Sequence, residues 1–443
     1  MILKIYIKLN LHKFIISLFL LVYFIPEVFD SVDRIGPQWT VLSLLNLVVS
    51  SYFLYRYNDY IKPFIKNIKI ESKYLICYSL FILFSFISII YAQNLAEFII
   101  TFSQYFTIFT TFILLSICFG KLKDKVNFFL NLNILLVCLE VSYILILFSL
   151  FFDYEIGIVR NRFYGGAAAN VNIAAFSLVF KVPFVLYKLY KTKGNLKILF
   201  CYLLLFSLIL FCVFISFSRG AFLALSFSVV TSLVYFIYFE YKRNRFFIKN
   251  LVLMLFFILV TFMTYNFLNK NKQVLSHVSY STRSLVDRYS TISINTQDGS
   301  VNQRLRYYNQ IIARASKNPF LGVGLGNHKL ISIKDDNFGI KKYIIPYHAH
   351  NDFLQILSES GLLALIPYLL LFYFMIKYLF DLWNNNYLDK RFLIFSCLIA
   401  LGVYIIDSML NFPIARPISQ LQWVFLISMI VSLYINFKKD EKV

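Results

Sequence analysis

Long apolar runs recur along the whole chain, and short polar connections separate them. Each run is close to the roughly 20 residues that an α-helix needs to cross the apolar core of a bilayer, so the pattern predicts about twelve transmembrane helices. The first run is followed at once by others and has no small-residue cleavage site, so we expect it to remain as a helix. The predicted spans are 14–29, 37–56, 74–92, 96–119, 127–152, 167–188, 197–217, 220–240, 247–268, 361–384, 391–410 and 420–437.

Composition supports a membrane protein. Hydrophobic residues make up 59% of the chain, charged residues 15%, and the mean hydropathy is +0.70. A soluble fold of 443 residues could not bury that much apolar surface. The six cysteines all lie inside apolar runs without metal-ligand spacing, which is typical of core or lipid-facing positions. The predicted fold class is an all-α polytopic membrane protein.

The distribution of lysine and arginine predicts the orientation, because short cytoplasmic loops hold the excess of positive charge. Basic residues gather before the first span, in the even-numbered connections and after the last span. The odd-numbered connections hold few, namely Arg34, Arg160, Arg162, Arg219 and Arg416. We therefore expect both termini in the cytoplasm and the odd-numbered connections outside. The net charge of +21 mostly reflects this topology, so a nucleic-acid partner has no support.

One outer connection, at about 269–349, is far longer than the others, and loops of this length are uncommon unless they are functional. It divides the chain into transmembrane helices one to nine (1–268), an outer loop with short helices (269–360), and helices ten to twelve with a cytoplasmic tail (361–443). Its basic residues greatly outnumber its four aspartates, and four of the five histidines lie in it: His277, His328, His348 and His350. Two interpretations fit, a solvated loop near anionic lipid headgroups and a binding surface for a phosphorylated ligand.

The end of this loop holds the strongest candidate for chemistry. Asp352 and Gln355 have capping-box spacing, which predicts a short helix beginning at Asp352 and places His350 just before its N-terminus. The helix dipole and nearby arginines would lower the pKa of this imidazole from about 6.5, and a neutral imidazole can accept a proton from a hydroxyl group. The alternative is that His350 completes a structural hydrogen bond. A zinc site with His348 lacks a further ligand at a recognisable interval.

Other candidates outside this segment also have two interpretations. Arg219 stands at an outer membrane edge, where an arginine binds an anion or snorkels to the interface. Gly322, Gly324 and Gly326 predict a tight turn that folds against the membrane, since no strand-turn-helix unit surrounds them to form a nucleotide loop. Lys181, in the inward half of its span, is interpreted as snorkelling to the cytoplasm.

Together these residues resemble the bacterial O-antigen ligase and polymerase superfamily. His350, Asn351, nine residues, Gly361, two residues and Ala364 are similar to its signature, which has glycine at the last position. Three further features agree in chain order: the turn Ser218, Arg219 and Gly220; Arg304 with Tyr308 at the start of an amphipathic loop helix; and the Pro-x-x-Gly-x-Gly-x-Gly turn within 318–326. Alanine is the nearest substitute for a helix-packing glycine, so Ala364 departs little from the pattern.

The resemblance implies a fold similar to the glycosyltransferase C-type membrane enzymes and a metal-independent, inverting transfer without a cofactor. The donor would be a glycan on undecaprenyl diphosphate at the periplasmic face of the bacterial inner membrane. Arg219 and Arg304, with Arg283 and Arg288 as further candidates, would bind the diphosphate. His350 would be the base on the acceptor hydroxyl, while Asp352 and Glu359, seven apart on one helical face, would orient groups or pair with arginine.

The sequence is compatible with several acceptors for the glycan. We favour ligation of O-antigen to lipid A-core, because the basic loop could hold a second phosphorylated lipid. A polymerase would pass the glycan to another carrier-linked repeat, and a protein O-oligosaccharyltransferase to serine or threonine. From a different class, a lipid-linked oligosaccharide flippase can also have about twelve spans, but transporters usually have internal repeats and polar residues at the bilayer midplane, which we do not detect in the sequence.

Overall fold

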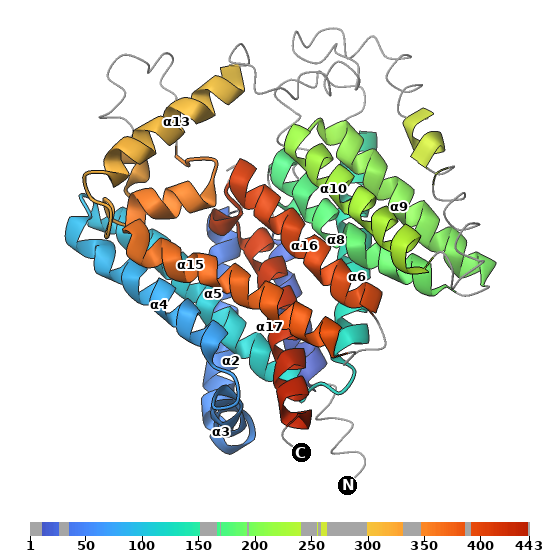
Figure 1. Ribbon diagram of the computed structural model, residues 1–443, viewed down its shortest axis with the longest axis horizontal. Coiled ribbons are helices and arrows are strands. Elements are labelled where there is room, and N and C mark those ends of the chain that lie inside the picture. Colours follow the sequence, from blue (N-terminus) through green and yellow to red (C-terminus); the bar gives the residue numbers. More distant parts are fainter. Residues whose placement is uncertain are drawn as a thin grey trace.

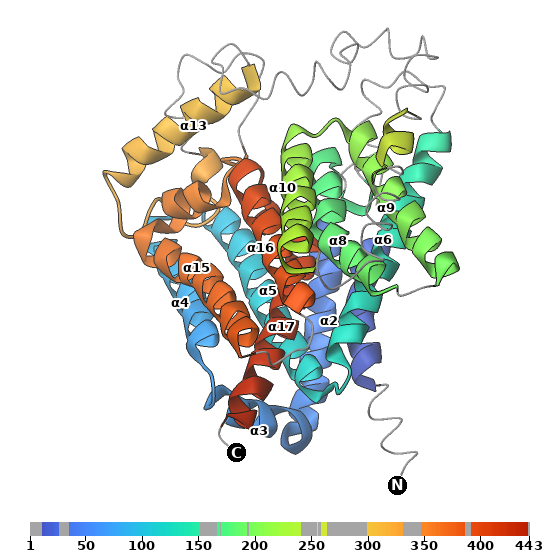
Figure 2. The same ribbon diagram turned by 45° about the vertical axis from the view of Figure 1, so that its right-hand side comes forward.

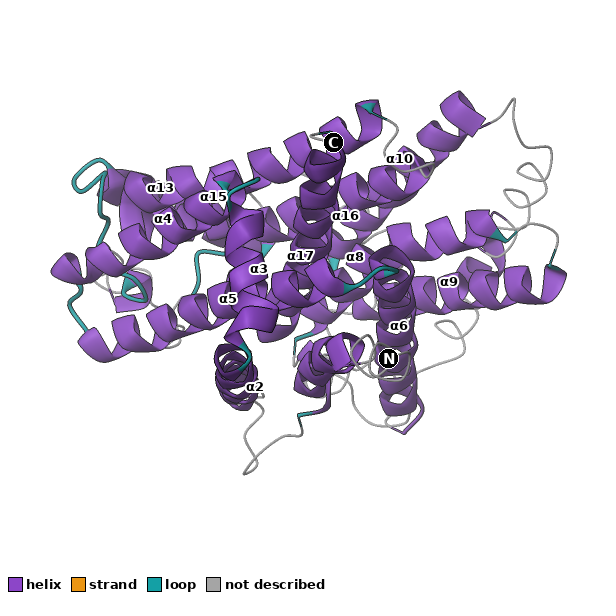
Figure 3. Cartoon of the chain, turned by 90° about the horizontal axis from the view of Figure 1, so that it is seen from below, coloured by secondary structure: helices purple, strands orange, loops and turns teal. Residues whose placement is uncertain are grey.

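The computed structural model describes residues 11–25, 35–150, 166–168, 170–192, 195–240, 255, 258–263, 299–330, 347–385 and 391–441. Within these residues the chain is helical and contains no strand (Figure 3). The elements, in chain order, are η1 (Phe19–Phe24), α2 (Ile35–Tyr55), α3 (Tyr57–Ile68), α4 (Lys73–Ile87), η2 (Ser88–Tyr91), α5 (Leu95–Lys121), α6 (Lys125–Leu150), η3 (Gly166–Ala168), α8 (Val171–Lys191), α9 (Leu196–Ser216), α10 (Arg219–Tyr235), η4 (Phe236–Glu240), α13 (Gly299–Ala315), α15 (Asp352–Asn384), α16 (Arg391–Leu410), η6 (Pro413–Ala415) and α17 (Pro417–Asp440).

The predicted all-α polytopic membrane fold is confirmed. Nine helices of the described residues are long and apolar enough to cross a membrane, and Leu11–Phe24 is a shorter apolar helix. Eleven of the predicted spans overlap a described helix, although the helices at 14–29 and 37–56 are not among the nine. Of 247–268, only the helical residues 255 and 258–263 are described. Asparagine side chains begin several of these helices: Asn94, Asn170 and Asn195 each accept backbone hydrogen bonds from the first turn of α5, α8 and α9.

Two helices form the centre of the bundle. In the most apolar stretches of α8 and α17, 89% and 94% of the residues are buried, against 39% to 61% for the other seven spans. Helix α17 packs against α5 and α15, and α8 packs against α9, α10 and α16 (Figures 1 and 2). The outer helices expose leucine, isoleucine and phenylalanine on their other faces, as lipid contact requires.

The two ends of the bundle differ in composition. Helix α13 and the start of α15 lie at one end, and the amphipathic helix α3 and the last turns of α17 lie at the other (Figure 1). Lys62, Lys66, Lys438 and Lys439 are therefore at the end opposite α13. Because short cytoplasmic connections hold the excess of lysine and arginine, and long loops are exempt from this rule, we expect α13 to lie outside.

This orientation predicts a labelling pattern. In a variant without native cysteines, a cysteine at Ser300, in α13, should react with a membrane-impermeant maleimide applied to the outer face, whereas one at Asn67, in α3, should react only after the membrane is opened. Mass spectrometry or a gel shift measures both. The reverse pattern would contradict the orientation.

The interpretation of Lys181 as a snorkelling residue is wrong. Its side chain is fully buried, and its Nζ lies 2.9 Å from both carboxylate oxygens of Glu140 on α6 and donates to Ser177 Oγ and O, also at 2.9 Å. Gln422, on α17, donates to Ser177 Oγ and to Tyr23 Oη. This arrangement could not be predicted from the sequence, because the partner carboxylate lies on another helix. The network joins α6, α8, α17 and η1 inside the bundle, where a buried charge needs such partners.

Candidate active site

His350 lies at the end of the bundle where α13 packs, in a backbone conformation that few side chains adopt. Its φ is +54°, in the left-handed region, which is uncommon for residues other than glycine. The Tyr308 hydroxyl of α13 donates to the carbonyl of His350 at 3.2 Å and to that of Met409 of α16 at 3.4 Å. Ala349, fully buried, donates its N–H to Gln355 Oε1 at 3.3 Å. Contacts from three helices therefore hold this backbone.

The predicted helix after His350 begins at Asp352, as expected, but a different residue caps it. Asn351 accepts the N–H of Leu354 at 3.1 Å through its side-chain oxygen. The fully buried Asp352 instead accepts the backbone N–H of Ile414 at 3.1 Å. Asp352 thus ties the start of α15 to the turn between α16 and α17.

That turn, residues 411–416, supplies the ring against which both histidines pack. The Phe412 ring is stacked on His348 at 4.2 Å between centroids and meets His350 edge-on at 5.1 Å. The guanidinium of Arg416 lies over the same ring, 4.6 Å from its centroid. Two imidazoles and one arginine are thereby gathered around a single buried phenylalanine.

The site keeps its histidines neutral. Burial, then Arg304 of α13 and Arg416 of the turn, lowers the pKa of His350 to about 4. Burial, Arg416 and His350 lower the pKa of His348 to about 3. The sequence prediction that nearby arginines lower the pKa of His350 agrees with this arrangement, although burial has the larger effect. Nδ1 of His350 is buried and has no hydrogen-bond partner among the described residues.

The glycine turn packs directly on the helix that follows His350. Gly322, Gly324 and Gly326 have positive φ, and Val323 and Gly324 donate to the carbonyls of Ser358 and Glu359, each at 2.9 Å. Helix α15 breaks at this point, because Gly361 has φ +70° and ψ −170°. The turn therefore replaces hydrogen bonds that the break removes, and it fixes Asp352–Ser360 as a separate short helix before the membrane span.

Side chains around the glycine turn attach it to the rest of the bundle. Asn327 accepts the N–H of Asn94 at 2.7 Å, and Lys329 forms an ion pair with Glu97 of α5 at 2.6 Å. The buried His328 contacts Arg314 of α13 at 3.4 Å and the Ser358 hydroxyl at 3.2 Å. Because arginine can only donate, Nδ1 of His328 accepts, and burial together with Arg314 lowers its pKa to about 3. His328 therefore has a bonded, structural position.

The predicted arginines fall into three groups. Arg304 lies on α13 close enough to His350 to affect its charge. Arg219 is the first residue of α10, and the next residue, Gly220, packs against Leu410, since a Cβ there would lie 3.2 Å from the Leu410 side chain. Leu410 ends α16 two residues before Phe412, so α10 begins beside the same turn. Arg283 and Arg288 lie outside the described residues.

The two supporting carboxylates are both buried. Asp352 binds Ile414 N, as described above, and Glu359 accepts a hydrogen bond from Gln355 Nε2 at 3.4 Å, one turn earlier on α15. No group of three or more His, Cys, Asp or Glu side chains in the described part of the chain could hold a metal ion.

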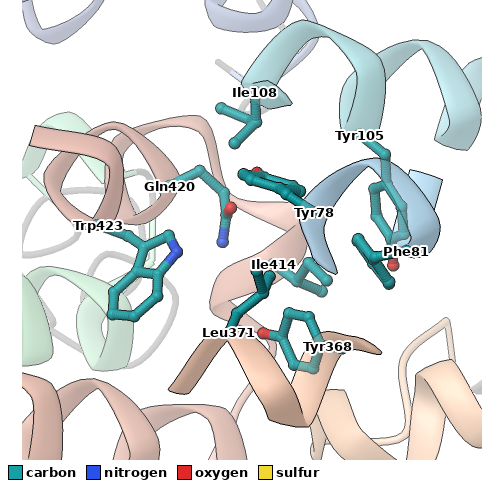
Figure 4. Close-up of a pocket in the computed structure, with 9 residues that line it drawn as sticks. All are labelled: Tyr78, Phe81, Tyr105, Ile108, Tyr368, Leu371, Ile414, Gln420 and Trp423. Carbon is teal, nitrogen blue, oxygen red and sulfur yellow. The ribbon is translucent and has the colours of Figure 1, made fainter. Parts of the chain in front are cut away.

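The space below the site is small. A cavity of about 10 Å³ lies between α4, α5, α15 and α17, and rings of Tyr78, Phe81, Tyr105, Tyr368 and Trp423 line most of it (Figure 4). Gln420, whose amide points among these rings, donates to the Tyr404 hydroxyl at 2.6 Å. The cavity has room for about one water molecule.

Sequence reasoning missed Phe412 and Arg416 as site residues. They lie in a short connection some sixty positions after His350, and Arg416 was considered only as one of the few basic residues of the odd-numbered connections. One feature of the sequence could have pointed to this turn: Pro413 and Pro417 indicate a rigid turn at the outer end of two spans.

The O-antigen ligase family model matches residues 204–369, which include Arg219, Arg304 and His350. Similar proteins provisionally named polysaccharide ligases occur in Rickettsia conorii, with 32% identity over 129 residues, and in Rickettsia felis, with 30% over 129 residues. A third, in Rickettsia prowazekii, is 36% identical over 110 residues. The first two alignments cover 28% of this chain and 29% of the relative, and the third covers 24% and 25%. The chain thus matches less than a third of the length of these relatives.

Proposed function

We propose that this chain, which the O-antigen ligase family model matches over residues 204–369, transfers a glycan from an undecaprenyl-diphosphate carrier to an acceptor hydroxyl at the periplasmic face of the inner membrane. The observation on which this proposal mainly rests is the buried Nδ1 of His350, unbonded among the described residues, at one end of the bundle, beside the Phe412 ring over which Arg416 also lies. Neutral bases and phosphate-binding cations are the two groups that such a transfer requires.

The donor's diphosphate would bind to Arg304 and Arg219, which α13 and α10 bring to the same end of the bundle. Arginine suits this ligand because its planar donor fork matches phosphate oxygens and its charge does not titrate near neutral pH. Arg283 and Arg288 are proposed to add to the same clamp. Neutralising the charge that develops on the diphosphate makes it a better leaving group.

His350 would act as the base. The acceptor oxygen attacks the anomeric carbon while its proton moves to the imidazole, and the carbon–oxygen bond to the diphosphate breaks with its electron pair on the leaving group. One displacement of this kind inverts the configuration at the anomeric carbon. Asp352 and Glu359 would support the site by fixing Ile414 and Gln355 rather than by reacting. The energy comes from the diphosphate linkage.

Ligation to lipid A-core is the acceptor that we favour, and polymerisation is the alternative. The names of the Rickettsia relatives favour ligation over a flippase. Lys181 and Glu140 are buried polar residues of the kind that a transporter would use, but they bond to one another and to Ser177. The cavity beside Glu140 measures about 10 Å³, so no glycan headgroup fits there.

Deleting the gene distinguishes the two acceptors. Loss of a ligase should leave long glycan chains on the undecaprenyl carrier and lipid A-core bare, because polymerisation continues without transfer. Gel electrophoresis of lipopolysaccharide and mass spectrometry of the carrier-linked pool measure both species. A deletion strain whose lipid A-core bears a single repeat would contradict ligation and support the polymerase. A strain with unchanged lipopolysaccharide and carrier pools would contradict both.

A further inference from the structure

Arg416 occupies a position in the fold that is fixed by the helix bearing the histidine motif. The Phe412 and Pro413 carbonyls accept the N–H groups of Ala415 and Arg416, at 3.1 and 3.0 Å. Asp352 accepts the N–H of Ile414 at 3.1 Å. Arg416 is also the residue before Pro417, the first residue of α17. These bonds hold the turn to the start of α15 and place Arg416 where the positive end of a central helix meets the outer end of the bundle.

The side chain of Arg416 is oriented by Phe412. The guanidinium carbon of Arg416 lies 4.6 Å from the centroid of the Phe412 ring, within the range of a cation–π contact. The same ring is in contact with His348 and His350. Phe412 thus contacts both imidazoles, and Arg416 packs over the same ring.

The positive charge of Arg416 lowers the pKa of both histidines. Among charged groups, Arg416 lowers the pKa of His348 most. For the pKa of His350, its effect is second to that of Arg304. The acidic groups nearby face the turn from other sides: Asp352 binds Ile414 N, and Asp407 of α16 accepts the Asn411 side-chain amide at 2.7 Å. Arg304 and Arg416, from separate elements, thus both lower the pKa of His350.

We propose that Arg416 is a diphosphate-binding residue, which together with Arg304 holds the donor's phosphate groups beside His350. This inference rests on the proposed function and deepens it. Arg416 lies outside residues 204–369, the region that the family model matches, so the match does not bear on it. Arg304 belongs to α13 and Arg416 to the turn, so two separate elements would each contribute a guanidinium to the diphosphate.

One consequence concerns the base. Without donor, the two arginines and burial keep the pKa of His350 at about 4, which makes the imidazole a weak base. A bound diphosphate brings negative charge that offsets both arginines and raises this pKa towards its usual range. Donor binding and activation of the base are then linked. The acid limb of kcat/KM should therefore lie below that of kcat, because kcat/KM reports the free protein.

The test compares Arg416→Ala with Arg416→Lys and with a matched control, Arg391→Ala. Arg391 lies at the other end of α16 and is also over an aromatic ring, 5.9 Å from the centroid of Trp383. The probe is undecaprenyl diphosphate without glycan, titrated into the purified full-length proteins in detergent. Because a charge-assisted hydrogen bond contributes about 1.5–3 kcal/mol, we expect Arg416→Ala to raise its Kd by about 10- to 100-fold.

The substitutions also separate charge from folding. Arg416→Ala should shift the acid limb of kcat/KM upward, whereas Arg416→Lys, which keeps the charge, should leave that limb in place and raise Kd less. The control should change neither quantity. If wild type binds the probe and Arg416→Ala binds it equally well with an unchanged pH profile, Arg416 has no such role. If wild type does not bind the probe at all, the proposed function itself fails.

Discussion

Replacing His350 by asparagine is expected to reduce glycan transfer by about 100- to 10,000-fold, the usual contribution of a positioned base. Asparagine is the better test than alanine, because it tolerates the left-handed backbone that His350 adopts at φ +54°. Expression, membrane insertion and thermal stability should stay close to wild type. The rate of transfer with saturating donor measures the effect, so weaker binding is excluded as its cause.

A histidine elsewhere in the bundle provides the control. His12 is buried in Leu11–Phe24 and packs beside Tyr60 with 5.6 Å between ring centroids, at the end where α3 lies. His12→Gln should keep the wild-type rate. Near-normal transfer by His350→Asn would refute the role of His350 as base.

The pH dependence follows from the same residue. The pKa of His350 is about 4 in the folded protein against about 6.5 in an unfolded chain, so the imidazole stays neutral in the fold throughout this interval. Activity measured as kcat/KM should therefore persist below pH 6 and fall only near pH 4. The folded state binds fewer protons than the unfolded state between these values, so stability should decrease as the pH falls from about 6.5 towards 4.

Gly361→Ala is expected to disrupt the fold around the site. A Cβ at this position would lie 2.2 Å from the carbonyl oxygen of Phe320, and the backbone at φ +70° and ψ −170° is one that only glycine adopts readily. Backbone strain of about 1–3 kcal/mol adds to that clash. The clash can be relieved only if the glycine turn moves away from α15. We expect a lower apparent Tm and loss of transfer.

The control for this substitution is Gly120→Ala near the end of α5, where a Cβ would meet nothing within 4 Å. It should be neutral or stabilise by up to about 1 kcal/mol, since alanine favours helix more than glycine does. Thermal unfolding in detergent compares the two variants. Wild-type stability and transfer in Gly361→Ala would contradict the described packing of the glycine turn.

The helices could be predicted from the sequence because a bilayer imposes one length and one composition on every span. The short helix after His350 was also predictable, although its cap was assigned to Asp352 rather than Asn351. Both residues can cap a helix, and only the contact of Asp352 with Ile414 decides between them. The local sequence was therefore enough to predict the helix, but not the role of each side chain at its start.

Contacts between distant elements were not predictable. Lys181 resembled a snorkelling lysine because Glu140 lies 41 positions away on another helix. Phe412 and Arg416 resembled an ordinary turn, since their partners are histidines of the preceding loop. Arg304 was identified through resemblance to a family, and His350 first through its place before a predicted helix. The effect of one on the other requires the packing of α13 on α15.

The most direct measurement of the central proposal is the release of undecaprenyl diphosphate by the purified protein in liposomes, with a carrier-linked glycan as donor and lipid A-core as acceptor. We predict that release is stoichiometric with glycosylated acceptor, that it continues in EDTA, and that His350→Asn lowers both products together by about 100-fold or more. Wild-type protein that transfers no glycan and releases no carrier to any supplied acceptor would contradict the proposal.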